Sequence, residues 1–184
     1  MRLRSLVISA LLATVAIFVA PAAASAGPSD AGQRVLPGDF RIAAWAHLQN
    51  ANSGLCLVSR AGSGERPALQ TTCDFTVGQY WADQYWEIRG AGDGGWSIHN
   101  LALGLCLVGR GGESTVVATT CDWKVGQSWA DQHWILWSTS VGYRFENVAT
   151  GLCLVTRGSG ESRAVVSTCD YKVGQYWADQ HWYY

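Results

Sequence analysis

The sequence predicts an all-β fold built from one unit that is written three times. Two sequence blocks recur at near-constant spacing, and no segment shows a sustained helical period. Of the 184 residues, 48% are hydrophobic and 15% are charged, which excludes a disordered, highly charged chain. The formal net charge is −1, and the sequence lacks the clustered basic residues that a nucleic-acid-binding surface needs. We therefore expect no nucleic-acid partner.

The repeated unit is defined by its two blocks. The first has the pattern Gly-Leu-Cys-Leu-Val and begins at Gly54, Gly104 and Gly151. The second begins with Thr-Cys-Asp, ends in Gln-x-Trp and spans residues 72–86, 120–134 and 168–182. Matches of this length at this spacing indicate three structurally equivalent copies.

Each copy is predicted to contribute four short strands separated by turns. An alternating segment that ends in Asn comes first, the Leu-Cys-Leu-Val segment second, a short apolar segment third, and the residues from the final Gln-x-Trp onward fourth. The first strands are 46–50, 96–100 and 143–147, the second 55–58, 105–108 and 152–155, and the third 68–70, 116–118 and 164–166.

About twelve short strands fit a closed all-β domain. The third copy ends at Tyr184, directly after its fourth strand, as expected for a ring of three units rather than an array that could continue. Closing the last strand against the first would also remove exposed sheet edges. The fold class predicted is therefore a β-trefoil of three four-stranded units.

Residues before the first copy have a different character. Arg2 and Arg4 precede an apolar run and the small residues Ala24-Ser25-Ala26, the order found in a secretory signal peptide. The run is shorter than the roughly 20 residues of a membrane span. We therefore expect a signal peptide at 1–26, an N-terminal tail at 27–43 and the trefoil domain at 44–184, in a secreted, extracellular protein without a membrane span.

The six cysteines allow fifteen pairings, and the repeat selects one of them. One disulfide inside each copy gives Cys56–Cys73, Cys106–Cys121 and Cys153–Cys169. A metal site is disfavoured because no Cys-x-x-Cys spacing occurs. An exported, oxidising compartment permits these bridges.

Each copy carries two tryptophans in its second block. Trp86, Trp134 and Trp182 lead into an apolar strand, so we expect them in the core, with the Gln of each Gln-x-Trp bonded to backbone turns. Trp81, Trp129 and Trp177 come five residues earlier in a polar segment. For these three, a role as core filler and a role as an exposed platform both remain open.

The three Gly-Leu-Cys-Leu blocks, three cysteine pairs and three final Gln-x-Trp elements resemble the ricin B-type lectin family of β-trefoils. The likeness covers Ala44 to Tyr184. It implies carbohydrate binding, often of galactose-type sugars, in up to three shallow pockets, one per unit.

The residues that the resemblance would place in the sugar pocket are absent. Its Asp two residues after the first Cys is replaced by Val58, Val108 and Val155. Its aromatic residue two positions before the second Cys is replaced by Thr71, Thr119 and Ser167. Its amide before the last Gln-x-Trp is replaced by Asp83, Asp131 and Asp179. We therefore expect the usual galactose pocket not to be built.

The segment between the second Cys and the final Gln-x-Trp offers a replacement, because aromatic rings and carboxylates suit both sugar stacking and hydroxyl binding. The candidate carbohydrate-binding residues are Tyr80, Trp81, Asp83, Trp129, Asp131, Tyr176, Trp177 and Asp179. The carboxylates that directly follow the second Cys are instead expected to pair with arginines four residues after the first Cys. These pairs would be Asp74 with Arg60, Asp122 with Arg110 and Asp170 with Arg157.

Two functions fit this pattern. The first is a secreted, non-catalytic lectin whose three equivalent shallow sites gain from avidity on a glycan or polysaccharide. The second is a protein-binding adaptor or subunit of a secreted complex, which would use residues 27–45, including Phe40, Ile42 and Trp45, as a docking segment. The spacing suggests no nucleophile–base pair and no isolated pair of carboxylates, so we expect no enzyme, no cofactor and no metal.

Overall fold

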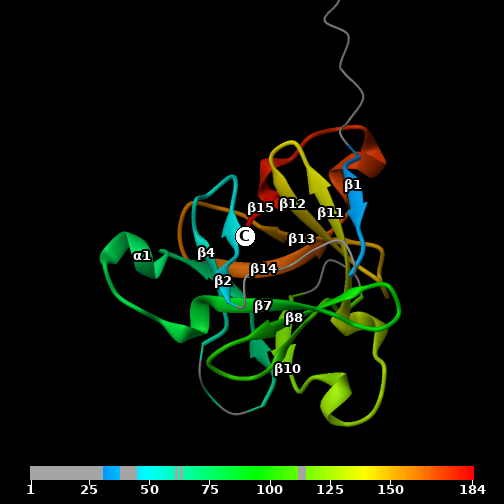
Figure 1. Cartoon of the computed structure of the whole chain (residues 1–184). Coiled ribbons are helices and arrows are strands. Elements are labelled where there is room, and N and C mark those ends of the chain that lie inside the picture. Colours follow the sequence, from blue (N-terminus) through cyan, green and yellow to red (C-terminus); the bar gives the residue numbers. More distant parts are fainter. Residues whose placement is uncertain (1–30, 38–44, 61, 63, 112–114) are drawn as a thin grey trace, which may run out of the picture.

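The computed structural model describes residues 31–37, 45–60, 62, 64–111 and 115–184. The predicted signal peptide at 1–26, with Phe40 and Ile42 of the tail, lies outside these residues. Strands dominate the described part of the chain, which folds as the predicted β-trefoil (Figure 1). No helix among the described residues is long and apolar enough to cross a membrane.

The four strand positions of each copy are occupied as the sequence predicts. In the first copy the initial strand is split by Leu48 into β2 and β3. The first copy holds β2 (Ala46–His47), β3 (Gln49–Asn50), β4 (Cys56–Val58), β6 (Leu69–Thr71) and β7 (Tyr85–Gly90), with β5 (Arg66–Pro67) between β4 and β6. The second holds β8 (Trp96–Asn100), β9 (Cys106–Val108), β10 (Val117–Thr119) and β11 (His133–Thr139). The third holds β12 (Gly142–Asn147), β13 (Cys153–Thr156), β14 (Ser162–Ser167) and β15 (Trp182–Tyr183).

The ring closes through the same strand pairing at all three junctions between copies. The final Trp of one copy lies opposite the Asn that ends the first strand of the next. The pairs are Trp86 with Asn100, Trp134 with Asn147, and Trp182 with Asn50. The last pair joins residues from the two ends of the domain, so the third copy meets the first as the other neighbours meet each other.

The pseudo-threefold axis is marked by a cycle of backbone hydrogen bonds. Ala68 N–H donates to Val116, Val116 N–H to Ala164, and Ala164 N–H back to Ala68, with N···O distances of 2.8, 2.9 and 2.8 Å. All three residues are fully buried. Each copy thus satisfies a backbone donor of its neighbour, which buried amides require.

The core consists of equivalent apolar residues from the three copies. Leu48, Ile98 and Phe145 supply one set, and Leu57, Leu107 and Leu154 another. The predicted core tryptophans Trp86, Trp134 and Trp182 are fully buried, and each indole N–H donates to the carbonyl of Leu57, Leu107 or Leu154 at 2.9–3.2 Å. The three predicted disulfides are present, with Cα–Cα distances of 5.0, 4.9 and 5.0 Å.

One strand belongs to no copy. In the predicted tail, β1 (Gln33–Val35) pairs antiparallel with β11, beside which it runs in Figure 1. The indole N–H of Trp96 donates to the carbonyl of Val35 at 2.9 Å. This part of the tail is therefore an edge strand of the domain.

Candidate functional site

Each copy carries a long loop between its second cysteine and its final Gln-x-Trp. Two short helical turns shape each loop. They are α1 (Asp74–Val77) and η1 (Ala82–Gln84) in the first copy, η2 (Asp122–Lys124) and η3 (Ala130–Gln132) in the second, and η4 (Asp170–Val173) and η5 (Ala178–Gln180) in the third.

A buried carboxylate fixes the shape of each loop. Asp74 Oδ2 accepts a hydrogen bond from the backbone N–H of Trp81 at 2.8 Å. The Gln of the final Gln-x-Trp locks the same turn: Gln84 Oε1 accepts from the Asp74 N–H, and its Nε2 donates to Thr72. These bonds satisfy the buried polar groups, and they confirm the expected role of the Gln.

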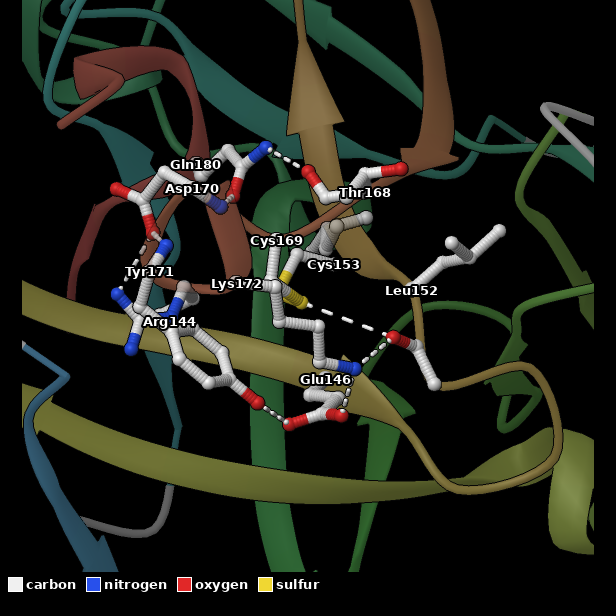
Figure 2. The surroundings of a disulfide bond; sticks show 12 residues. Arg144, Glu146, Leu152, Cys153, Thr168, Cys169, Asp170, Tyr171, Lys172 and Gln180 are labelled. Atoms are coloured by element: carbon white, nitrogen blue, oxygen red, sulfur yellow. Dashed lines mark hydrogen bonds and ion pairs between the residues drawn. A yellow bond between two sulfur atoms is a disulfide. The ribbon is translucent and has the colours of Figure 1, made fainter. Parts of the chain in front are cut away.

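The same contacts recur in the other two copies. Figure 2 shows Gln180 bonded to Asp170 and to Thr168, beside the Cys153–Cys169 disulfide. Asp122 and Asp170 accept the backbone N–H of Trp129 and Trp177 at 2.8 and 3.1 Å. The position of each loop tryptophan is therefore set by a buried Asp seven residues earlier.

The predicted pairing of these buried carboxylates with Arg60, Arg110 and Arg157 is wrong. Asp74 pairs with His47, Asp122 with His133, and Asp170 with both Arg144 and His181. Each carboxylate faces inward, toward side chains of the barrel strands and of the residues that begin the fourth strand. The arginines lie on the outer side and meet the second carboxylate of the loop.

This second carboxylate is the one before the final Gln. Arg110 Nη1 lies 3.3 Å from Asp131 Oδ2, and Arg157 Nε lies 3.5 Å from Asp179 Oδ2. In the first copy, the charge of Arg60 acts on Asp83. Arg110 and Arg157 therefore pair with the carboxylate of their own copy at the surface, whereas Arg60 forms its ion pair with Glu161 at 2.5 Å. Arg110 also pairs with Glu65.

The loop tryptophan, the carboxylate and the arginine line a hollow together. The first hollow, of about 670 Å³, is lined by Arg60, Thr71, Thr72, Val77, Tyr80, Trp81, Ala82, Asp83 and Ala102. The second, of about 610 Å³, is lined by Arg110, Thr119, Ser128, Trp129, Ala130, Asp131, Gln132 and Ala149. We call them the first and second Trp–Asp–Arg hollows.

Both hollows lie at a junction between copies, because Ala102 and Ala149 come from the following copy. Trp81 and Trp129 are 36% and 37% exposed. This excludes a place in the core for Trp81 and Trp129, and their role as platforms for a ligand stays a prediction. Tyr80 is more exposed and lies 4.9 Å from the ring of Tyr85.

The third copy keeps the same residue types. Trp177 is partly buried, and Arg157 bonds Ser167 Oγ at 3.2 Å while it pairs with Asp179. Tyr176 is exposed, and its ring lies 4.8 Å from that of His181. The structure thus places the predicted candidates of each copy on one loop, and whether they bind sugar stays a prediction.

Burial raises the pKa of Asp83 above its ordinary value, and the positive charge of Arg60 opposes this rise. Burial likewise raises the pKa of Asp179 against the charge of Arg157. The Oδ1 atoms of both carboxylates are buried without a hydrogen-bond partner among the described residues.

The departures from the ricin B-type pattern have a structural counterpart. Val58, Val108 and Val155 are fully buried and cannot contact a ligand. Thr71 and Thr119, at the positions expected for an aromatic platform, line the same hollows as Trp81 and Trp129. In these two hollows, the loop tryptophan supplies the aromatic ring that the threonine of the third strand lacks.

Sequence reasoning missed the arginines of the hollows. Arg60, Arg110 and Arg157 recur four residues after the first Cys, but spacing alone did not distinguish which of two recurring carboxylates they face. Among the described residues, no group of three His, Cys, Asp or Glu is placed to hold a metal ion.

Comparison with known proteins gives a family and a fold. A model of the ricin-type beta-trefoil lectin domain matches residues 44–182. No curated protein matches the chain at a significant level.

Several solved structures are similar to this chain. The designed three-fold symmetric protein ThreeFoil has a TM-score of 0.62 at 16% identity, with 76% of this chain and 96% of that chain covered. The Rhizoctonia solani agglutinin has a TM-score of 0.61 at 15% identity, covering 78% and 95%. The hemolytic lectin CEL-III has a TM-score of 0.58 at 23% identity, covering 87% of this chain and 31% of its own. At these identities the likeness establishes the fold.

Proposed function

Since this chain belongs to the ricin-type beta-trefoil lectin domain family, we propose that it binds carbohydrate through its Trp–Asp–Arg hollows. The observation that carries the proposal is the recurrence of one arrangement at two junctions of the ring: an indole wall, a carboxylate and a guanidinium around one hollow. The corresponding residues of the third copy, Trp177, Asp179 and Arg157, supply the third site.

The chemistry of each hollow suits a sugar. An indole face packs against the C–H surface of a pyranose ring. A carboxylate accepts hydrogen bonds from neighbouring hydroxyls, and a guanidinium donates to hydroxyl or ring oxygens; both bonds are strengthened by charge. Trp81, Asp83 and Arg60 offer these three groups in the first hollow. Arg60 and Arg110 also pair with Glu161 and Glu65, so the surroundings of both hollows carry an excess of carboxylates and favour a sugar without negative charge.

We further propose that the protein is a secreted, non-catalytic module with three equivalent shallow sites. The three disulfides favour an oxidising compartment. Shallow single sites bind weakly, but three on one rigid body can raise the apparent affinity for a repetitive surface about 100-fold or more. A polysaccharide or a densely glycosylated surface is the ligand that such a body fits.

A glycan and polysaccharide array tests the proposal directly. We expect the protein to be retained on a subset of glycans, and the combined change Trp81→Ala, Trp129→Ala and Trp177→Ala to abolish retention. The matched control is Trp123→Ala, which removes an exposed tryptophan of the same kind of loop but outside the Trp–Asp–Arg hollows. Retention unchanged in the triple variant, or equally lost in the control, would overturn the assignment of the hollows.

The alternative function, a protein-binding adaptor, predicts a different experimental result. If residues 27–45 dock a partner protein, the partner must compete with β11 for β1 or use the remainder of the segment. Two results together would favour the adaptor: the protein binds no glycan, and a pull-down recovers a partner only when residues 27–45 are present.

A further inference from the structure

A further hollow lies beside the second Trp–Asp–Arg hollow, and Ser128 lines both. It measures about 430 Å³ and is formed by the β7–β8 hairpin on one side and the loop after Cys121 on the other. Its lining residues that matter here are Arg89, Ser97, Asp122, Trp123 and His133. The comparison of the three copies shows why this hollow exists.

The three copies differ at one inward-facing position of their first strand, three residues before the Asn. His47, Ser97 and Arg144 are equivalent there. His47 Nε2 contacts Asp74 Oδ1 at 2.6 Å, and Arg144 Nη1 contacts Asp170 Oδ1 at 2.8 Å. Two copies therefore place a basic side chain on the buried loop carboxylate.

The second copy has no such side chain. The hydroxyl of Ser97 is too short to replace a guanidinium, and it donates to the carbonyl of Arg89 at 3.4 Å. Ser97 and Asp122 both line the hollow, so it lies where the second copy carries Ser97 in place of the arginine of the third. We attribute the hollow to the serine that stands at the position of this arginine.

The two groups that contact Arg144 in the third copy, an aromatic ring and a carboxylate, have equivalents in the second copy. In the third copy, the guanidinium of Arg144 lies 4.4 Å from the ring centre of Tyr171, and Asp170 Oδ1 also accepts the Tyr171 N–H at 2.7 Å (Figure 2). In the second copy Trp123 stands at the position of Tyr171, and Asp122 Oδ1 accepts its N–H at the same 2.7 Å. Tryptophan is the strongest aromatic partner for a cation.

Around the hollow, the carboxylates of Asp122 and Asp93 share a single histidine partner. Asp122 is buried, and His133 lies between it and Asp93 at 2.9 and 2.6 Å. Two carboxylates therefore meet at one imidazole. Arg89, at the rim, pairs with Glu87, and its guanidinium carbon lies 5.8 Å from the centre of the Trp123 ring. Lys124 Nζ lies 5.4 Å from the same ring centre, so both cations approach Trp123 without pairing with Asp122. Within the described part of the chain, no Arg or Lys forms an ion pair with Asp122.

We propose that this hollow is a binding site for a guanidinium group, carried by a small molecule or by an arginine side chain of a partner. The ligand stacks on Trp123 and donates to Asp122 Oδ1, as Arg144 does on Tyr171 and Asp170. A planar guanidinium satisfies the ring face and the carboxylate at once, which a compact ammonium does not. The site is independent of the proposed carbohydrate binding.

Backbone and indole NMR signals of Trp123 report on occupancy. We expect methylguanidinium to shift the signals of Trp123 and Ser97 saturably, whereas urea, its planar neutral counterpart, leaves them in place. Ser97→Arg supplies the missing side chain, so it should abolish the shifts and raise the melting temperature. Tyr183→Arg adds the same charge at an exposed position outside the hollow, and it should keep the shifts.

A second titration distinguishes the two sources. Shifts with both methylguanidinium and acetyl-arginine amide indicate that an arginine side chain can enter, and shifts with methylguanidinium alone indicate a small molecule. The proposal is overturned if methylguanidinium gives no saturable shift at Trp123, if urea gives the same shift, or if the shifts persist in Ser97→Arg.

Discussion

At the scale of single residues, each copy contains two tryptophans, five residues apart, that have different surroundings. Trp86 is fully buried and donates to a core carbonyl, whereas Trp81 lies at the edge of a hollow, where its backbone N–H donates to Asp74 and its carbonyl accepts from the Gln84 N–H. The buried Asp74 makes this division possible, because it holds the loop so that the second indole cannot enter the core. The tryptophan outside the core is the one to which we assign the proposed carbohydrate binding.

The raised pKa of Asp83 predicts how binding depends on pH. Protonation turns one carboxylate oxygen into a donor and removes the charge that strengthens its hydrogen bonds from hydroxyls, and burial raises the pKa of Asp83 above the ordinary 3.8 against the opposing charge of Arg60. Retention on glycan through the first hollow should therefore fall as the pH is lowered, with its midpoint above pH 3.8. The measurement uses a variant with Trp129→Ala and Trp177→Ala, so that one hollow remains.

Asp83→Asn is the control for this prediction. The amide cannot titrate but still accepts a hydrogen bond, and it restores the residue type expected from the family pattern. We expect its affinity to persist and its acid sensitivity to disappear. An unchanged loss of binding in acid, or a complete loss of binding at neutral pH, would contradict the role given to this carboxylate.

At the scale of elements, β1 shows that the domain extends beyond its three copies. It completes the sheet along β11 and accepts the buried indole N–H of Trp96 through Val35. The guanidinium of Arg144 also donates to the carbonyl of Ala31. Removing this segment would leave two buried donors without their partners.

We therefore expect a chain that starts at Leu36 to unfold more easily than one that starts at Gly27, by about 2 kcal/mol or more, since each unsatisfied buried donor costs about 1–3 kcal/mol. Chemical denaturation of the two chains measures the difference. Equal midpoints would mean that β1 is a dispensable arm, which would favour its use as a docking segment for a protein partner.

The elements also show what the sequence could and could not predict. The strands, the disulfides and the buried Gln-x-Trp elements follow from repetition, because equivalent residues must have equivalent surroundings. β1 has no equivalent, so no internal comparison pointed to it. The partners of Arg60, Arg110 and Arg157 were mistaken because each loop carries two carboxylates at fixed spacing, and only the fold decides which faces outward.

At the scale of the whole molecule, one side-chain contact repeats at every junction. Asn50, Asn100 and Asn147 donate from Nδ2 to the backbone carbonyls of Asp179, Asp83 and Asp131 at 2.9, 2.8 and 2.8 Å. These aspartates also carry the carboxylates of the hollows. The residues that close the ring thus also position the carboxylates of the proposed sites.

This equivalence predicts that Asn50→Ala and Asn100→Ala destabilise the protein by similar amounts, about 1–3 kcal/mol each, because each removes a buried hydrogen bond across a junction. The two contacts differ greatly in sequence separation, 129 residues against 17. Urea unfolding curves of the two variants provide the comparison. A negligible effect of Asn50→Ala beside a large effect of Asn100→Ala would indicate an open chain of copies.

The central claim is that the copies present matching carbohydrate sites at their loop tryptophans. Indole N–H signals of Trp81, Trp129 and Trp177, followed by NMR while a glycan retained on the array is titrated, test it most directly. The account predicts that these three signals shift together and saturate, while those of the buried Trp86, Trp134 and Trp182 stay in place. A retained glycan that leaves all three loop signals unmoved would contradict it.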